Sequence, residues 1–371
     1  MTKLWNKKGR YQNSFIIISG ILLFILSLMQ IIKPVNVSGP SLFRYVGVIF
    51  GVPTLIVSCL ALGYEAVCLI LKNEKLNRYK PFVFYILLFF LCFFLLEHVI
   101  LGIIRTFISA AKYSQIPEKT MFWTSVSWLL INKYQDFLNG ILVTLSISLL
   151  GTIIGLILGL LLAILRIQKV NNEDSELKAS LKKFGLGFSK VYIAIFRGTP
   201  MMVQAILLYY LVPFAMSEAM NIPMSTMNKI FTWFVSGLIT VSLNTTAYLA
   251  EVIRGSIEAI DKGQMEASRS LGMTYWQTMF NVILPQALKN AMASVGNEFV
   301  INIKDTSVLN VISVIDVYKI ASNIQSQTYR FNEPFFIAAC IYLVLTFVTT
   351  RLLALIDKSM DVKAKPLPSS N

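Results

Sequence analysis

Polar side chains recur at helical spacing inside an apolar stretch of the chain. Asn244, Tyr248 and Glu251 fall on one face of a helix over residues 230–253, with Thr245 beside them. Polar residues inside a membrane span normally face a bundle interior or a cavity, and they mark substrate routes. The stripe therefore indicates a pathway for a polar solute. An interhelical hydrogen-bond seam, or a Glu251–Arg254 pair at i, i+3, explains it equally well.

Arg197 lies near the start of another apolar run, in the segment Phe196-Arg197-Gly198-Thr199-Pro200. An arginine at the bilayer centre costs about 2.5–3.5 kcal/mol on insertion scales, so this position should lie at an interface or face polar partners. Pro200 should interrupt the helix and free backbone carbonyls. Two interpretations are equally supported: a structural joint beside a polar pathway, and an arginine that snorkels from a helix end.

The segment from Arg254 to Leu288 is too polar to cross a membrane but keeps a helical period. Gly272 interrupts that period, and a glycine there most simply marks a turn between two short helices. Pro285 then suits the start of the next helix. We expect a helical hairpin, held at both ends by membrane spans, that can transmit force from a soluble partner. An amphipathic hairpin lying on the surface without a partner is the alternative.

These segments belong to a chain whose composition is that of a membrane protein. Of 371 residues, 56% are hydrophobic and only 14% are charged, against about 25% charged in soluble domains. The composition excludes a disordered chain, a small disulfide scaffold and a cytosolic enzyme. The net charge of +14 fits the lysines and arginines of cytoplasmic loops better than a nucleic-acid role. The four cysteines lie in apolar runs and have no metal-binding spacing.

A membrane-spanning helix needs about 20 mainly apolar residues, and eight segments qualify. They are Ser14–Ile32, Val46–Leu71, Phe82–Ile104, Phe137–Leu165, Val191–Val212, Ile230–Ile253, Leu284–Ile303 and Pro334–Ile356. With the N-terminus inside, 22 of the 33 basic residues fall in cytoplasmic segments and 10 fall outside, while Arg197 lies within a span. This bias predicts that both termini are cytoplasmic.

The chain also divides by character. We expect a three-span extension over residues 1–135, a five-span functional core over 136–357 and a cytoplasmic tail over 358–371. Gly151, Gly155 and Gly159 are spaced for close helix packing in the core. In the extension, Glu97 and His98 have the chemistry of a proton relay, although hydrogen bonding near the outer interface is the stronger interpretation.

The hairpin residues resemble a known signature. The segment from residue 266 to residue 285 resembles the EAA motif of bacterial ABC-importer permeases, E-A-A-x3-G-x9-I-x-L-P. In it, Glu266-Ala267-Ser268 is followed after three residues by Gly272, after nine more by Val282 and after one more by Leu284-Pro285. Ser268 and Val282 depart from the pattern but keep its spacing. Further stretches of residues 136–357 resemble the polar amino-acid branch of that family (histidine, glutamine and glutamate types). These are 196–200, 242–251, 262–264, 284–288, 296–298 and 304–307.

This resemblance implies an all-α integral membrane protein of the bacterial plasma (inner) membrane with a five-span permease core. The three N-terminal spans lie outside the resemblance, and with them the chain would have eight transmembrane helices. It implies a second permease subunit, identical or homologous, two cytoplasmic ATPase subunits and an extracytoplasmic amino-acid-binding protein. The cytoplasmic coupling helix that meets the ATPase would carry six residues: Gln264, Glu266, Ala267, Ser268, Leu271 and Gly272.

For the substrate pathway, the resemblance and the polar stripe point to the same residues. They are Asn244, Thr245, Tyr248 and Glu251, with Arg197, Asn297, Glu298, Lys304 and Asp305 as second candidates. A zwitterion in a low-dielectric core needs both hydrogen-bond donors and acceptors. Glu251 would face the amino group or pair with Arg254, and the 304–307 stretch would alternatively form a packed turn.

The predicted function is uptake of polar or charged amino acids by alternating access. The sequence has no Gly-x4-Gly-Lys-[Ser/Thr] loop, so it is not expected to be an enzyme, to bind ATP or to carry a metal or cofactor. An ion-coupled secondary transporter would show inverted repeats with broken helices in both halves, which this sequence lacks. A non-transporting membrane scaffold would not need the glycine-hinged hairpin.

Overall fold

The computed structural model describes residues 14–27, 41–71, 79–94, 100, 102–168, 170 and 174–361, and the regular elements in these ranges are all helices. The chain divides into two compact units, Met1–Gln115 and Ile116–Asn371. This boundary falls inside the predicted three-span extension, because α6 (Phe122–Asn132) packs on helices of the second unit.

The first unit contains the helix Ser14–Ser27, α2 (Ser41–Leu71), α4 (Lys80–Phe94) and α5 (Gly102–Ala110). Its core consists of Ile16, Leu23, Ala61 and Leu87, packed among further apolar side chains. Glu65 is buried in α2 and accepts a hydrogen bond from the Lys80 ammonium at 3.2 Å, which joins α2 to the start of α4. The predicted Glu97–His98 pair lies outside the described residues.

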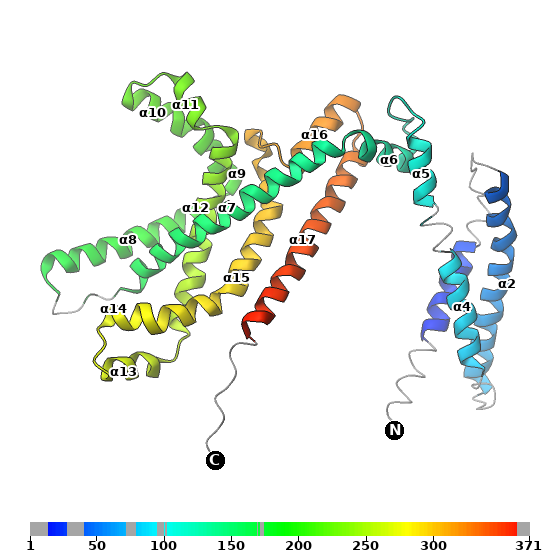
Figure 1. Cartoon of the computed structure of the whole chain (residues 1–371), viewed down its shortest axis with the longest axis horizontal. Helices are drawn as coiled ribbons and strands as arrows, with labels where there is room; N and C mark the ends of the chain where they lie inside the picture. Colours follow the sequence, from blue (N-terminus) through cyan, green and yellow to red (C-terminus); the bar gives the residue numbers. More distant parts are fainter. Residues whose placement is uncertain are drawn as a thin grey trace, which may run out of the picture. The chain divides into compact units, whose positions relative to one another are not determined.

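The second unit carries the remaining helices. After α6 these are α7 (Tyr134–Ile167), α8 (Glu176–Gly198), α9 (Met201–Ile206), the π-helical turn η2 (Leu207–Leu211), α10 (Val212–Met220), α11 (Met224–Ile230), α12 (Trp233–Glu258), α13 (Lys262–Ser270), α14 (Tyr275–Thr278), the π-helical turn η3 (Met279–Ile283), α15 (Leu284–Asp305), the 3₁₀ helix η4 (Thr306–Ile312), α16 (Val317–Thr328) and α17 (Asn332–Asp361). Helix α7 packs along α12, and α15 packs on α17 (Figure 1).

The contact between α7 and α12 depends on the predicted glycine stripe. A Cβ added at Gly155 would lie 2.6 Å from Cγ2 of Thr245, and one at Gly151 would lie 2.6 Å from Cγ1 of Val241. At Gly159 it would meet the backbone nitrogen of Ala250 at 3.1 Å. The prediction that these glycines serve close helix packing is therefore confirmed.

Three helices in the described part of the chain are long and apolar enough to cross a membrane: Tyr134–Ile167, Met201–Met220 and Asn332–Asp357. The bent pair Met224–Ile230 and Trp233–Glu258 counts as a fourth if it forms one span. Three shorter apolar helices lie in the first unit, and α15 is too polar to qualify. The count of eight spans therefore stays a prediction.

The predicted fifth span, Val191–Val212, is not one continuous helix. Helix α8 ends at Gly198, Thr199 has an extended backbone, and Pro200 caps the start of α9. The proline interrupts the helix as expected, because its ring displaces the preceding turn and it has no N–H to donate.

Candidate functional site

Two side-chain amides donate hydrogen bonds to backbone carbonyls at the break between α8 and α9, which we call the joint. The carbonyl of Phe196 accepts a hydrogen bond from Gln204 Nε2 at 2.9 Å and another from Asn244 Nδ2 at 3.2 Å. Gln204 also donates to the carbonyl and hydroxyl of Thr199, at 3.0 and 2.9 Å. The carbonyls freed at the break therefore receive partners from α9 and α12, as a helix interruption inside a membrane requires. Asn244 belongs to this joint.

Thr245 lies in a buried seam that joins three helices. Its hydroxyl accepts a hydrogen bond at 3.0 Å from Nδ2 of Asn302 on α15, and the same amide donates to Oγ1 of Thr152 on α7 at 2.9 Å. All three residues are at least 95% buried. The seam fixes the register of α7, α12 and α15 in a region otherwise held by small residues.

Glu251 lies between two arginines. One carboxylate oxygen accepts a hydrogen bond from Arg166 near the end of α7, and the other accepts from Nε of Arg254 at 3.0 Å. Arg254 also contacts the carboxylate of Glu258 at 2.6 Å. The arrangement contains the Glu251–Arg254 pair that the sequence offered as an alternative, and adds Arg166 from a second helix.

Four of the predicted pathway residues interact with one another. The guanidinium carbon of Arg197 lies 5.0 Å from the centroid of the Tyr248 ring, a cation–π contact. Arg197 and Asp305 both interact electrostatically with Glu298. Tyr248 is 38% exposed, so this cluster of both charge signs is accessible from one side of the unit. Of the other second candidates, Asn297 and Lys304 are exposed on α15.

The segment after α12 forms the predicted helical hairpin. Asp261 caps α13 by accepting a hydrogen bond from the backbone N–H of Gly263 at 2.8 Å, and Thr274 and Gln277 form a reciprocal capping box on α14. Gly272 has φ +87°, a conformation that side chains with a Cβ rarely adopt. The N–H groups of Gly272 and Met273 donate to the carbonyls of Arg269 and Ser268, closing α13 with a Schellman motif. The predicted turn at Gly272 is confirmed.

The hairpin presents one face outward. Gln264, Glu266, Ala267 and Gly272 are exposed, while Ser268 turns inward and donates to the carbonyl of Gln264 at 2.8 Å. Leu271 is 85% exposed at the tip. Burial raises the pKa of the neighbouring Tyr275 hydroxyl, so this phenol stays neutral at physiological pH.

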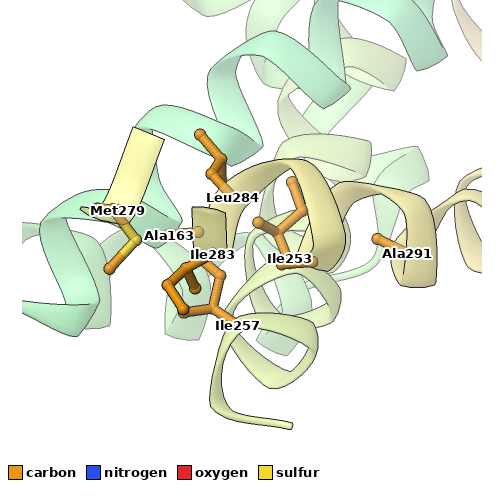
Figure 2. Packing of buried hydrophobic residues seen from close by; sticks show 8 residues of the cluster. Ala163, Ile253, Ile257, Met279, Ile283, Leu284 and Ala291 are labelled. Atoms are coloured by element: carbon orange, nitrogen blue, oxygen red, sulfur yellow. The ribbon is translucent and has the colours of Figure 1, made fainter. Parts of the chain in front are cut away.

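The inner face of the hairpin is anchored in a hydrophobic cluster (Figure 2). Met279 and Ile283 of η3 pack against Ile253 and Ile257 of α12 and Ala163 of α7. Leu284, Ala287 and Ala291 of α15 complete the cluster, and Met265 of α13 packs against it. The cluster therefore joins α13 and η3 to α7, α12 and α15.

Sequence reasoning missed several residues of these networks. Thr152 and Asn302 complete the buried seam, Arg166 completes the ion pair of Glu251, and Gln204 closes the joint. Asn302 is a polar residue inside a predicted span, and this feature of the sequence could have indicated its role. Thr152 follows directly after Gly151, but a threonine in an apolar helix gives no distinguishing pattern.

Comparison with known proteins identifies related sequences. The family described as "Binding-protein-dependent transport system inner membrane component" matches residues 177–362. A putative glutamine transport system permease protein of Rickettsia felis is 34% identical over 223 residues, covering 60% of this chain and 92% of that protein. The glutamine transport system permease protein of Escherichia coli K12 is 33% identical over 172 residues, covering 46% of this chain and 74% of that protein.

A solved structure also resembles this chain. The crystal structure described as an amino acid ABC transporter with histidines has 36% sequence identity and a TM-score of 0.52. The similarity covers 62% of this chain and 96% of that one.

Proposed function

The chain belongs to the family of binding-protein-dependent transport system inner membrane components, and from this we propose that it is the permease subunit of an ATP-driven importer of polar amino acids. It is a multi-pass inner-membrane protein with a translocating rather than an enzymatic role. Glutamine is the first substrate to test, because the glutamine permeases are its relatives.

One observation supports the coupling mechanism above all others. The segment from α13 to η3 combines an outward face, which carries Glu266 and the exposed Leu271, with an inward face that packs on α7, α12 and α15. We place Gln264, Glu266, Ala267, Ser268, Leu271 and Gly272 in the contact region for a partner ATPase. ATP-driven movement of the partner would shift the hairpin, and the hydrophobic cluster would pass that shift to α7, α12 and α15.

For the substrate route, the cluster of Arg197, Tyr248, Glu298 and Asp305 is the strongest candidate among the predicted residues. It offers cationic and anionic groups together, as a zwitterion needs. Asn297 and Lys304 are exposed on the same helix as Glu298. Asn244, Thr245 and Glu251 would act on transport through the joint, the seam and the ion pair that hold the helices around this cluster.

The rest of the proposed assembly follows the sequence predictions. The chain crosses the membrane eight times with both termini cytoplasmic, and residues 136–357 form the functional core. A second permease subunit completes the pathway, two ATPase subunits hydrolyse ATP, and a binding protein delivers the amino acid from outside.

Purification of the tagged chain in mild detergent tests the proposed complex. We expect an ATPase subunit to copurify and its turnover to rise when binding protein and glutamine are added together. A complex that contains no ATPase would refute the proposal. An ATPase that responds to another polar amino acid would change the substrate only.

The coupling role is tested by Glu266→Lys. We expect uptake to fall at least about tenfold while the protein remains inserted, because a reversed charge on the contact face opposes docking. Glu218→Lys on the exposed part of α10 is the matched control, since it makes the same charge change away from the hairpin. Uptake by Glu266→Lys equal to that of the control would contradict the coupling role.

A further inference from the structure

Helix α15 carries a line of polar side chains on its exposed side. The helix packs on α7, α12 and α17, and its remaining face exposes Gln286, Asn290, Asn297 and Lys304. The four are separated by four, seven and seven residues, a spacing that places them within about 40° of one another around the helix axis. We call this line the polar face of α15.

A contact with α7 fixes the level of the polar face. Nδ2 of Asn302 donates a hydrogen bond to Oγ1 of Thr152 at 2.9 Å. Thr152 lies near the middle of α7, a 34-residue apolar helix that is long enough to cross a membrane. Lys304 follows Asn302 by two residues, which is about 3 Å along the helix axis. The exposed lysine therefore lies at the level of the middle of a candidate span.

Lipid is an unsuitable neighbour for the polar face. A lysine facing hydrocarbon at this depth is unfavourable, and only lysines near the ends of a span can extend their ammonium group to the interface. The amides of Asn290 and Asn297 would also lose their hydrogen bonds with water. A dry contact with another protein would have to bury Lys304, and the desolvation of a buried ion can exceed what pairing restores. Water is the covering that these side chains favour.

We propose that the polar face of α15 lines a water-filled passage for a small polar solute, with Asn290, Asn297 and Lys304 along its wall. Asn297 and Lys304 directly precede Glu298 and Asp305, so the face continues from the accessible charged cluster. Side-chain amides both donate and accept hydrogen bonds, and an ammonium group attracts a carboxylate. This wall therefore suits a solute that carries a carboxylate or a carboxamide.

The other end of the polar face lies beside the hairpin. Nε2 of Gln286 donates to the carbonyl of Val282 in η3 at 2.8 Å, one turn before α15 begins to expose its asparagines. The passage would thus lead from the charged cluster toward the side of the unit that carries the hairpin. The identity of the solute rests on the proposed function, whereas the access of water to this face does not. The test therefore measures the two separately.

The test compares single cysteines at one membrane level. The four native cysteines are replaced by alanine, and the full chain is expressed in its own host in place of the wild type. Asn297→Cys reports on the polar face, and Leu352→Cys on the apolar, 56% exposed side of α17 is the matched control. A Cβ added at Gly296 would lie 3.2 Å from the side chain of Leu353, so the two cysteines occupy similar levels.

The rate of reaction with a cationic methanethiosulfonate is measured in unsealed membranes, which the reagent enters from both sides. We expect Asn297→Cys to react at least about tenfold faster than Leu352→Cys, because hydrocarbon disfavours both the thiolate and the charged reagent. Ala291→Cys, on the fully buried face of α15, gives the rate of a packed thiol, which Asn297→Cys should also exceed.

Equal rates at Asn297→Cys and Leu352→Cys would overturn the passage. Slow reaction at both would mean that lipid or dry protein covers the polar face, and fast reaction at both would place this level outside the membrane. Amino-acid uptake by the wild type is recorded in parallel. Uptake together with slow reaction at Asn297→Cys overturns the passage alone, whereas fast reaction there without uptake refutes the transport function and leaves the passage standing.

Discussion

Asn302, which the sequence analysis did not single out, connects three helices of the core. Its amide donates to hydroxyl groups on two other helices, and it is 97% buried. Thr245 was predicted to face a pathway, and its hydroxyl lies in this seam. A polar side chain inside a span therefore has two possible roles, and the partner on the neighbouring helix decides between them.

Asn302→Leu should destabilise the protein by about 1–2 kcal/mol, because it removes both hydrogen bonds and leaves the hydroxyl of Thr245 without a partner. The measurement is the free energy of unfolding of the purified chain in detergent. Adding Thr245→Val should recover part of the loss, since replacing both partners removes the unsatisfied group. Strict additivity of the two substitutions would argue against a coupled seam.

At the scale of elements, the joint between α8 and α9 and the hairpin of α13 and α14 are built in the same way. Each interrupts a helix at a proline or a glycine, and in each the backbone groups freed by the break find hydrogen-bond partners. At the joint the amides of Gln204 and Asn244 do this, and at the hairpin the Schellman turn at Gly272 does. Both breaks can be predicted from the sequence. The two side chains that hydrogen-bond to the Phe196 carbonyl at the joint, however, belong to residues 8 and 48 positions further along the chain.

The contact of α7 with α12 gives a prediction at this scale. Gly155→Ala should cost about 1–3 kcal/mol of stability, because the new Cβ meets Thr245 side-chain atoms at 2.6 and 2.8 Å and a backbone nitrogen at 3.2 Å. Thermal unfolding in detergent measures this. Gly255→Ala in α12 is the control: nothing lies within 4 Å of its added Cβ, so alanine should be neutral or stabilise by up to about 1 kcal/mol. Equal effects at the two positions would rule out close packing as the cause.

At the scale of the whole molecule, the two units have separate cores. In the described part of the chain, one hydrophobic cluster contains residues of the first unit alone, and five contain residues of the second alone. The buried Arg330 of the second unit donates hydrogen bonds to the backbone carbonyl of Pro117 and to the carboxylate of Glu333, which fixes the start of that unit. A unit with its own core is expected to fold alone.

A chain that starts at Ile116 should therefore insert and fold. We expect its unfolding temperature in detergent to lie within about 5 °C of the second-unit transition of the full chain. Coexpression of residues 1–115 as a separate chain is the control for an insertion defect, because it restores the first spans without the covalent link. Aggregation of residues 116–371 in both experiments would contradict independent folding.

The residue pattern alone predicts the helical membrane class, the break at Pro200, the close packing of the glycine stripe and the turn at Gly272. Each of these depends on local chemistry: apolar composition, a missing N–H, a missing Cβ or a positive φ. Only the tertiary structure decided which polar residues meet. Glu251 pairs with Arg166 across 85 positions, and Asn302 reaches Thr152 across 150, while Arg197 and Tyr248 meet at the accessible cluster. Helical spacing assigns a residue to a face, but the packing of helices distant in sequence determines what that face contacts.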